Sequence, residues 1–139
     1  RDYDQGMAIA RQEKKPVMLD FSGYGCVNCR EMEQSVLADD KVLDLINNDY
    51  VLISLYVDDK TPLPEPIRFT ENGKEVVLRS IGDKWSYLQR TKFGANAQPF
   101  YVLLDNEGHP LNTPRSYDED IDAYINFLEE GLSEYKTRK

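Results

Sequence analysis

Several features are scarce in this sequence of 139 residues, and each scarcity excludes a class of protein. The longest nearly continuous apolar run, Tyr50 to Val57, covers eight positions and is interrupted by Ser54. Because a membrane-spanning helix needs roughly 20 apolar residues, we expect no segment of this chain to insert into a membrane. Basic residues number 17 against 25 acidic ones, which gives a formal net charge of -8. A chain this acidic lacks the positive surface that binds nucleic acid or anionic lipid, so we expect neither as a partner.

The start of the chain also lacks familiar features. Arg1 is not an initiator Met, and no apolar segment of the signal-peptide type precedes the first helical pattern. These absences favour a processed product or a domain excised from a longer protein. Residues 1–139 have the length of a single domain, and 40% of them are hydrophobic, which is enough to bury a core.

Only two cysteines occur, Cys26 and Cys29, in the pattern C-V-N-C. Small secreted domains that depend on disulfides use several spaced pairs, so this pair is not a disulfide framework. A bond that closes so short a loop constrains the unfolded chain only weakly. The spacing therefore favours redox chemistry, with an inert disulfide and a metal site as the alternatives.

Metal and cofactor binding find little support in the sequence. Tetrahedral zinc takes four ligands, and the one histidine that could join the cysteines, His109, lies in a distant turn. Covalent haem attachment requires a histidine directly after the second cysteine, where this chain has Arg30. We therefore expect neither a metal nor a cofactor.

The apolar spacing predicts helices and strands in alternation. Helices are expected over residues 3–14, 30–36 and 84–92, and from about residue 118 onward. A further helical turn, capped by Asp40, is expected after the second of these. Buried strands are expected over residues 17–21, 50–57 and 100–104. The stretch around Leu111 is expected to return as an antiparallel edge strand.

The segment between the second and third strands has its own signals. Lys60 to Pro66 contains three prolines and is expected to be a loop. Asn72-Gly73 follows it between two β-rich runs, which is the strongest short-range signal for a hairpin. Together the elements predict an α/β domain of thioredoxin-like fold, with a central mixed sheet flanked by helices and an inserted hairpin at about 60–83.

The predicted position of the cysteines suggests a division of labour. A thiol in the first turn of a helix faces the positive end of the helix dipole and unpaired backbone N–H groups, which stabilise a thiolate. Cys26 is expected at the exposed start of the helix and Cys29 one turn deeper. Cys26 would then exchange with a partner disulfide, and Cys29 would resolve the mixed disulfide.

Two acidic residues are candidates for tuning these thiols. Asp20 interrupts the apolar strand six residues before Cys26, and burial there should raise the pKa of its carboxyl. It could carry the proton of Cys29 during exchange, or it could simply face solvent from an edge strand. Glu33 follows Cys29 by four residues and falls on the same helical face, where it either tunes the thiols or is a solvated helix residue.

Pro99, preceded by Gln98, opens the third strand. Proline is tolerated at the first position of a strand, so this placement needs no special role. In a thioredoxin-like fold it would instead be a cis-proline that faces the cysteines. Gly25 directly precedes Cys26, and a glycine there would let the backbone of a partner approach closely.

The residues around these features resemble a known family. Lys15–Phe21 (KPVMLDF), Cys26–Glu33 (CVNCREME), Tyr50–Val57 and Gln98–Gly108 resemble the C-terminal thioredoxin-like domain of the DsbD family of thiol:disulfide interchange proteins. The resemblance covers most of the chain and is far more specific than C-x-x-C alone.

The resemblance implies a monomeric periplasmic domain of an inner-membrane protein, in a family linked to cytochrome c biogenesis. It would take electrons from a membrane donor domain and pass them to a periplasmic acceptor. Carried over by position, Cys26 is the nucleophile, Cys29 is its resolving partner, and Asp20 and Glu33 are the acidic residues near the thiols. Gly25, Gln98 and Pro99, the last as a cis-proline, form the expected contact surface for partner proteins.

Two departures from the family pattern bear on the partner. Ser22 to Gly25 replaces a more aromatic approach to the cysteines, and its two glycines would either loosen the loop or admit a partner backbone. Tyr24 and Tyr101 would line the partner groove or serve in packing. The 60–83 insertion is either a docking platform or decoration of the surface.

The alternatives to a reductant are a disulfide-forming oxidase or isomerase, a module whose cysteines bind metal, and an adaptor whose cysteines are idle.

Overall fold

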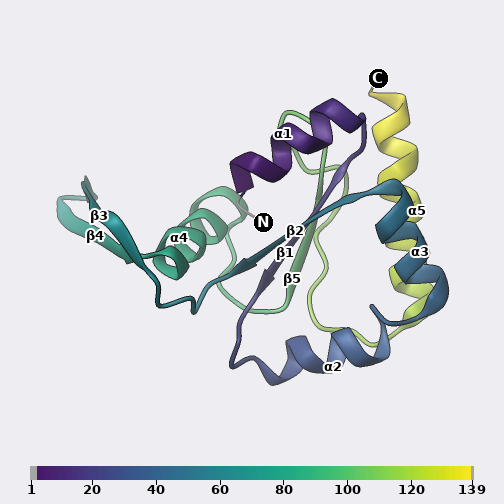
Figure 1. Cartoon of the computed structure of the whole chain (residues 1–139), viewed down its shortest axis with the longest axis horizontal. Coiled ribbons are helices and arrows are strands. Elements are labelled where there is room, and N and C mark those ends of the chain that lie inside the picture. The colour runs from purple at the N-terminus through teal and green to yellow at the C-terminus, as the bar shows by residue number, and fades with distance from the viewer. Residues whose placement is uncertain (1–2, 139) are drawn as a thin grey trace.

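The computed structural model describes residues 3–138, which form a mixed succession of helices and strands (Figure 1). In chain order they are α1 (Tyr3–Glu13), β1 (Val17–Ser22), α2 (Val27–Ser35), α3 (Asp40–Asp49), β2 (Val51–Tyr56), β3 (Pro62–Glu71), β4 (Lys74–Ser80), α4 (Ile81–Phe93), β5 (Phe100–Leu104) and α5 (Ile121–Thr137).

A three-stranded sheet in the order β2-β1-β5 forms the centre of the fold. β1 runs parallel to β2 and antiparallel to β5, so the sheet is mixed, as predicted. Because β1 has a neighbour on each side, all six of its residues are buried. Asp20 lies opposite Ser54 on β2 and Tyr101 on β5.

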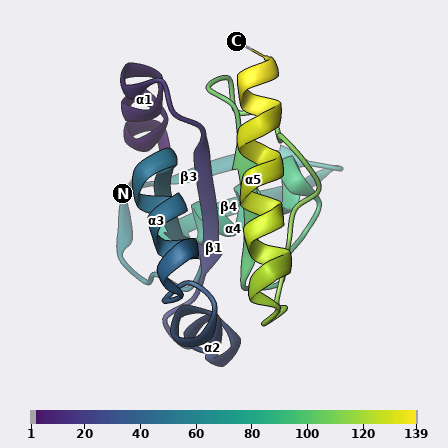
Figure 2. The same cartoon turned by 90° about the vertical axis from the view of Figure 1, so that its right-hand side faces the viewer.

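Helices cover both faces of this sheet, and alternate residues of β1 point into different cores. Val17, Leu19 and Phe21 pack with residues of α1 and α4. Met18 packs on the other face, with residues of α2, α3 and α5. Figure 1 shows α3 and α5 together to the right of the sheet, and in Figure 2, which is viewed from that side, they lie to the left and right of β1. The predicted thioredoxin-like arrangement is confirmed.

The inserted segment forms a separate two-stranded hairpin that projects beside α4 (Figure 1). Asn72 and Gly73 make its turn, with φ angles of 52° and 79°, in the left-handed region that the Asn-Gly signal predicts. The hairpin rests on α4 through Phe69, whose ring meets that of Tyr87 edge-on at 5.0 Å. The Tyr87 hydroxyl also donates a hydrogen bond to the Glu71 carboxylate.

The two ends of the insertion meet at one place. The N–H of Ile81 donates to the carbonyl of Thr61, and the N–H of Gly82 donates to that of Asp59, both at 2.9 Å. Gly82 is required by this close approach, because a Cβ there would lie 2.5 Å from the carbonyl oxygen of Val57. The start of α4 is therefore locked against the chain that leaves β2.

Some predicted boundaries were wrong. The segment 60–66 is not a loop throughout: all three of its prolines lie inside β3, because a hairpin strand paired on only one side tolerates residues without an N–H. The return near Leu111 makes only isolated bridges to β5, at Pro110 and Arg115, and forms no further strand among the described residues.

The helices also begin or end differently from the predictions. α2 begins directly after Cys26, three residues before the expected start. The cap of α3 is Asp39 rather than Asp40, and its carboxylate accepts from two backbone N–H groups of the first turn. Within residues 3–138, no helix has both the length and the apolar character that a bilayer crossing requires.

Candidate active site

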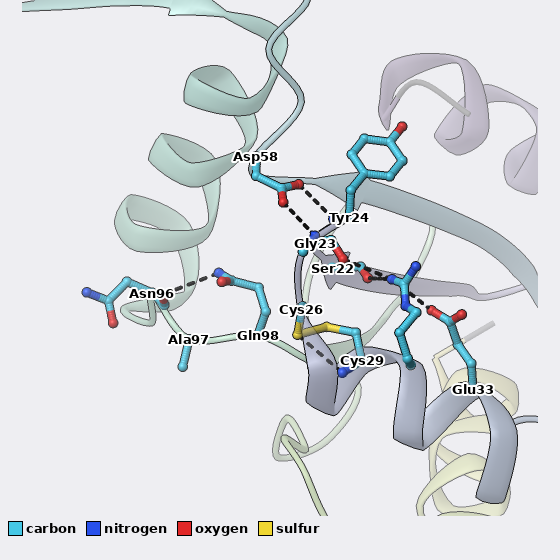
Figure 3. The surroundings of a disulfide bond; sticks show 12 residues. Ser22, Gly23, Tyr24, Cys26, Cys29, Glu33, Asp58, Asn96, Ala97 and Gln98 are labelled. Carbon is cyan, nitrogen blue, oxygen red and sulfur yellow. Dashed lines mark hydrogen bonds and ion pairs between the residues drawn. A yellow bond between two sulfur atoms is a disulfide. The ribbon is translucent and has the colours of Figure 1, made fainter.

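Cys26 and Cys29 form a disulfide at the start of α2 (Figure 3). Cys26 is the N-cap residue, and its sulfur accepts a hydrogen bond from the N–H of Cys29 at 3.2 Å. Its sulfur therefore lies at the positive end of the α2 dipole, where a thiolate is stabilised. Cys26 is half-buried and Cys29 is 2% exposed, which matches the predicted difference in depth.

The loop from Ser22 to Gly25, which leads to Cys26, is held from two sides. On one side the Arg30 guanidinium donates to the Ser22 hydroxyl at 3.3 Å and to the Gly23 carbonyl at 2.9 Å. On the other side the Asp58 carboxylate accepts from the N–H groups of Tyr24 and Gly25, at 2.8 and 3.0 Å (Figure 3). The glycines therefore do not leave the loop loose.

Asp58 is a site residue that the sequence analysis missed. The hydrogen bond from Gly25, together with that from Tyr24, lowers the pKa of its carboxyl, so it is ionised at neutral pH. A signal was available, because Asp58 follows β2, and the carboxyl ends of parallel neighbouring strands meet at one edge of a sheet.

Asp20 is 7% exposed and lies in the central strand, so the alternative in which it faces solvent from an edge strand is wrong. Burial raises the pKa of its carboxyl to about 7, and the negative charge of Glu33 adds to the increase. The positive charge of Arg30 acts in the opposite direction. A carboxyl with this pKa can both accept and release a proton near neutral pH.

Glu33 is partly exposed and pairs with Arg30 of the preceding turn, with 3.2 Å between its Oε2 and the guanidinium Nη2. It is therefore not simply a solvated helix residue. Its charge contributes to the raised pKa values of Asp20, Tyr56 and Tyr101. Glu33 thus belongs to the charged surroundings of the buried carboxyl.

The bond between Gln98 and Pro99 is cis, as the resemblance implies, and Pro99 is buried. Asn96, Ala97 and Gln98 lie among the surroundings of the disulfide in Figure 3. The buried Gln89 of α4 ties this segment down. Its amide donates to the Ala97 carbonyl at 2.8 Å, and its carbonyl accepts from the Gln98 amide at 2.9 Å.

Gln89 was also missed, because a polar residue within an amphipathic helix gives no sign in the sequence that it is fully buried. The expectation that Tyr101 lines a partner groove is wrong, since it is 1% exposed and packs edge-on against Tyr124. Tyr24 is 61% exposed and stacks on Tyr56 with 4.1 Å between ring centroids. Gly25 is exposed beside it.

The described residues offer no cluster of three or more His, Cys, Asp or Glu side chains placed to hold a metal ion. His109 lies in the turn after β5, where its ring approaches Asp105 and Glu107. Its side chain is largely exposed there.

The fold and the cysteine pair together define a class of protein. A family model described as thioredoxin-like matches residues 1–106, and the chain belongs to this family. The chain is 28% identical over 110 residues to the thiol:disulfide interchange protein DsbD of Pseudoalteromonas atlantica, an alignment that covers 70% of this chain. The resemblance to the DsbD family is therefore confirmed, although the match spans only 18% of that relative's length.

Solved structures agree on the fold. A thioredoxin from Thermus thermophilus matches with a TM-score of 0.69 at 17% identity, covering 98% of this chain and 88% of that one. The reduced C-terminal domain of Neisseria meningitidis DsbD matches with a TM-score of 0.62 at 19% identity, covering 92% of each chain.

Proposed function

We propose that this protein catalyses dithiol–disulfide exchange with partner proteins through Cys26 and Cys29. The observation that carries the proposal is a disulfide at the N-terminus of α2, on the same helix as groups that act on a buried carboxyl, Asp20. An inert disulfide would need no ionisable group in the buried strand that leads to it, and such a group is costly in an apolar core.

The proposed reaction begins with the pair reduced. The Cys26 thiolate attacks one sulfur of a partner disulfide, and the other partner sulfur leaves as a thiolate that takes up a proton. Cys29 then loses its proton, and its thiolate attacks the Cys26 sulfur. The bond between Cys26 and the partner breaks, so the partner leaves with two thiols. Two electrons have moved to the partner, and the Cys26–Cys29 bond has formed.

In this scheme Asp20 accepts the proton of Cys29 during the second step. The carboxyl is suited to this because its pKa of about 7 lies near the operating pH, where proton transfer in both directions is accessible. Glu33 assists by raising the pKa of Asp20 through its negative charge. We assign contact with the partner to Gly25, Gln98 and Pro99.

The partners that we propose follow the similarity to DsbD. The domain would receive electrons from a membrane donor domain and pass them to an acceptor on the periplasmic side. An oxidase or isomerase would use the same fold and motif with a more oxidising pair. The reduction potential of Cys26–Cys29 distinguishes these directions when it is measured by thiol alkylation across glutathione buffers.

A value of about -200 to -270 mV, between those of glutaredoxins and thioredoxin, would support the reductant relay. A value near about -120 mV would instead make the domain an oxidant. If no disulfide formed reversibly, the exchange reaction itself would be rejected.

The exchange itself is tested by trapping. Cys29→Ser should leave Cys26 joined to a disulfide-bearing substrate such as insulin, because the resolving thiol is missing. The mixed disulfide would be seen as a dithiothreitol-sensitive band on a non-reducing gel. Cys26→Ser/Cys29→Ser is the matched control and should give no such band. Failure of Cys29→Ser to trap any disulfide substrate would count against the proposed function.

A further inference from the structure

Arg30 occupies a central position that the proposed reaction does not yet use. Its Nη2 bridges the end of β1 and the loop before Cys26, through the Ser22 hydroxyl and the Gly23 carbonyl. The same nitrogen lies 3.2 Å from the Glu33 carboxylate. The Arg30 side chain therefore ties the start of the Ser22–Gly25 loop to α2, the helix at whose start the two cysteines lie.

The charges around Arg30 are mainly negative. The guanidinium charge acts to lower the pKa values of Asp20, Asp58 and Tyr56, which come from two segments of the chain, β1 and the end of β2 with the residues just after it. The side chain is partly buried, and its Nε has no hydrogen-bond partner among the described residues. The guanidinium contacts two neutral oxygens, on Ser22 and Gly23, and one carboxylate, that of Glu33.

We propose that Arg30 is a positioning residue of the exchange reaction: it fixes the Ser22–Gly25 loop and supplies the positive charge that stabilises Asp20 once Asp20 has lost its proton. This inference rests on the proposed function and deepens it. Asp20 can take the Cys29 proton only in its carboxylate form, which is the form that a nearby cation favours.

The step in which Arg30 acts is the resolution of the mixed disulfide. The Cys29 S–H bond breaks, and its proton moves to the Asp20 carboxylate. The Cys29 sulfur bonds to Cys26, and the partner sulfur departs with the electron pair of the broken bond. Asp20 later returns its proton to solvent, and its charge is again balanced by Arg30.

The charged and titratable groups that act on Asp20 come from four elements. They are Arg30 and Glu33 of α2, Tyr56 of β2, Tyr101 of β5 and Tyr124 of α5. Burial raises the pKa of each tyrosine above its ordinary value, so the tyrosines remain neutral through the pH range of the test. Within that range the charges that act on Asp20 are therefore those of Arg30 and Glu33, together with any thiolate formed at Cys26 or Cys29 in the reduced protein.

The test compares four versions of the full chain: the native protein, Arg30→Lys, Arg30→Gln and Arg30→Met. Each is made with and without Asp20→Asn. The rate at which the reduced proteins reduce insulin disulfides is measured from pH 5 to pH 9. The native rate should rise as the Cys26 thiol and the Asp20 carboxyl ionise. In Arg30→Gln and Arg30→Met this rise should move to higher pH by about 0.5 unit or more, because the balancing charge is gone.

Arg30→Lys keeps the charge and should keep the rise near its native pH, although it loses the planar fork of donors. In the Asp20→Asn background, the charge-removing variants should shift the profile less, because only the effect of Arg30 on the thiols remains. Arg68→Met, which removes an exposed charge on β3, is the matched control and should leave the profile unchanged.

An unshifted profile in Arg30→Gln and Arg30→Met would overturn the inference while leaving the proposed function intact. An equal shift with and without Asp20 would overturn it as well. If the native protein did not reduce insulin at all, the proposed function would be the one to fail. Arg30→Gln keeps donors for the loop, so it provides the result if Arg30→Met does not fold.

Discussion

β1 and the β3–β4 hairpin both contain charged residues, but the two place those residues in opposite surroundings. All six residues of β1 are buried, Asp20 among them, whereas most of the hairpin is exposed. On the hairpin, Arg68 and Glu75 pair at 3.2 Å in solvent, where such a pair contributes little. In β1 the single carboxyl has a pKa of about 7. Burial therefore decides which charged residues become chemically useful.

The largest expected effect comes from removing the buried charge itself. Asp20→Asn should slow the reduction of insulin at pH 7 by roughly 100-fold, because an amide cannot accept the Cys29 proton. Stopped-flow kinetics of the reduced protein would measure this. An unchanged rate would remove Asp20 from the mechanism.

The same substitution should change stability with a defined pH dependence. The folded-state pKa of Asp20 lies above its unfolded value of 3.8, so folding takes up a proton between about pH 4 and pH 7. Asp20 therefore lowers stability progressively as pH rises through that window. Asp20→Asn should gain nothing at pH 4 and on the order of 1–3 kcal/mol at pH 8 in urea unfolding. A gain that was equal at both pH values would contradict the assigned pKa.

An intermediate effect is expected at Asp58, an exposed carboxylate that holds the loop before Cys26. Asp58→Ala should slow insulin reduction about 3- to 10-fold, because the loop loses two of its hydrogen bonds. Its stability deficit should be present at pH 7 and disappear as pH falls through the lowered pKa of Asp58. Asp44→Ala, which removes an exposed carboxylate on α3, is the control for net charge. Equal rates in the two variants would exclude the loop-holding role.

The smallest effect on exchange is expected in the hairpin. Gly73 has a φ of 79°, so Gly73→Ala should cost about 1 kcal/mol of stability by thermal or urea unfolding. The insulin reduction rate should not change. Gly25→Ala is the matched opposite, because a Cβ there meets only an ordinary contact, 3.8 Å from Asp58. It should keep its stability and slow exchange with a protein substrate. A Gly73→Ala variant with slowed exchange would show that hairpin and site are coupled.

Local patterns account for what could be predicted. The β1 run, the cysteines at the start of a helix and the Asn-Gly turn each depend on neighbours a few residues apart. The hydrogen bonds of Asp58 with Tyr24 and Gly25 join residues 34 and 33 positions apart, and only the parallel pairing of β1 with β2 indicates that these segments meet. The burial of Gln89 could not be predicted, because its hydrogen-bond partners lie in the 96–98 segment, which only the folded chain brings onto α4. The prolines indicated a loop, but they lie in β3, a strand that pairs on only one side and therefore tolerates residues without an N–H.

The meeting of Thr61 with Ile81 also has a practical consequence. Residues 62–80 leave and re-enter the body at adjacent points, and they pack on it through the contacts of Phe69 and Glu71 with Tyr87. Loop closure becomes only slightly more costly with length, and exposed segments of this kind accept new sequence readily. The hairpin is therefore a suitable insertion site for engineering: a fluorophore, an affinity peptide or a foreign recognition module could be introduced there while Gly82 keeps its close contact with Val57 and Asp59.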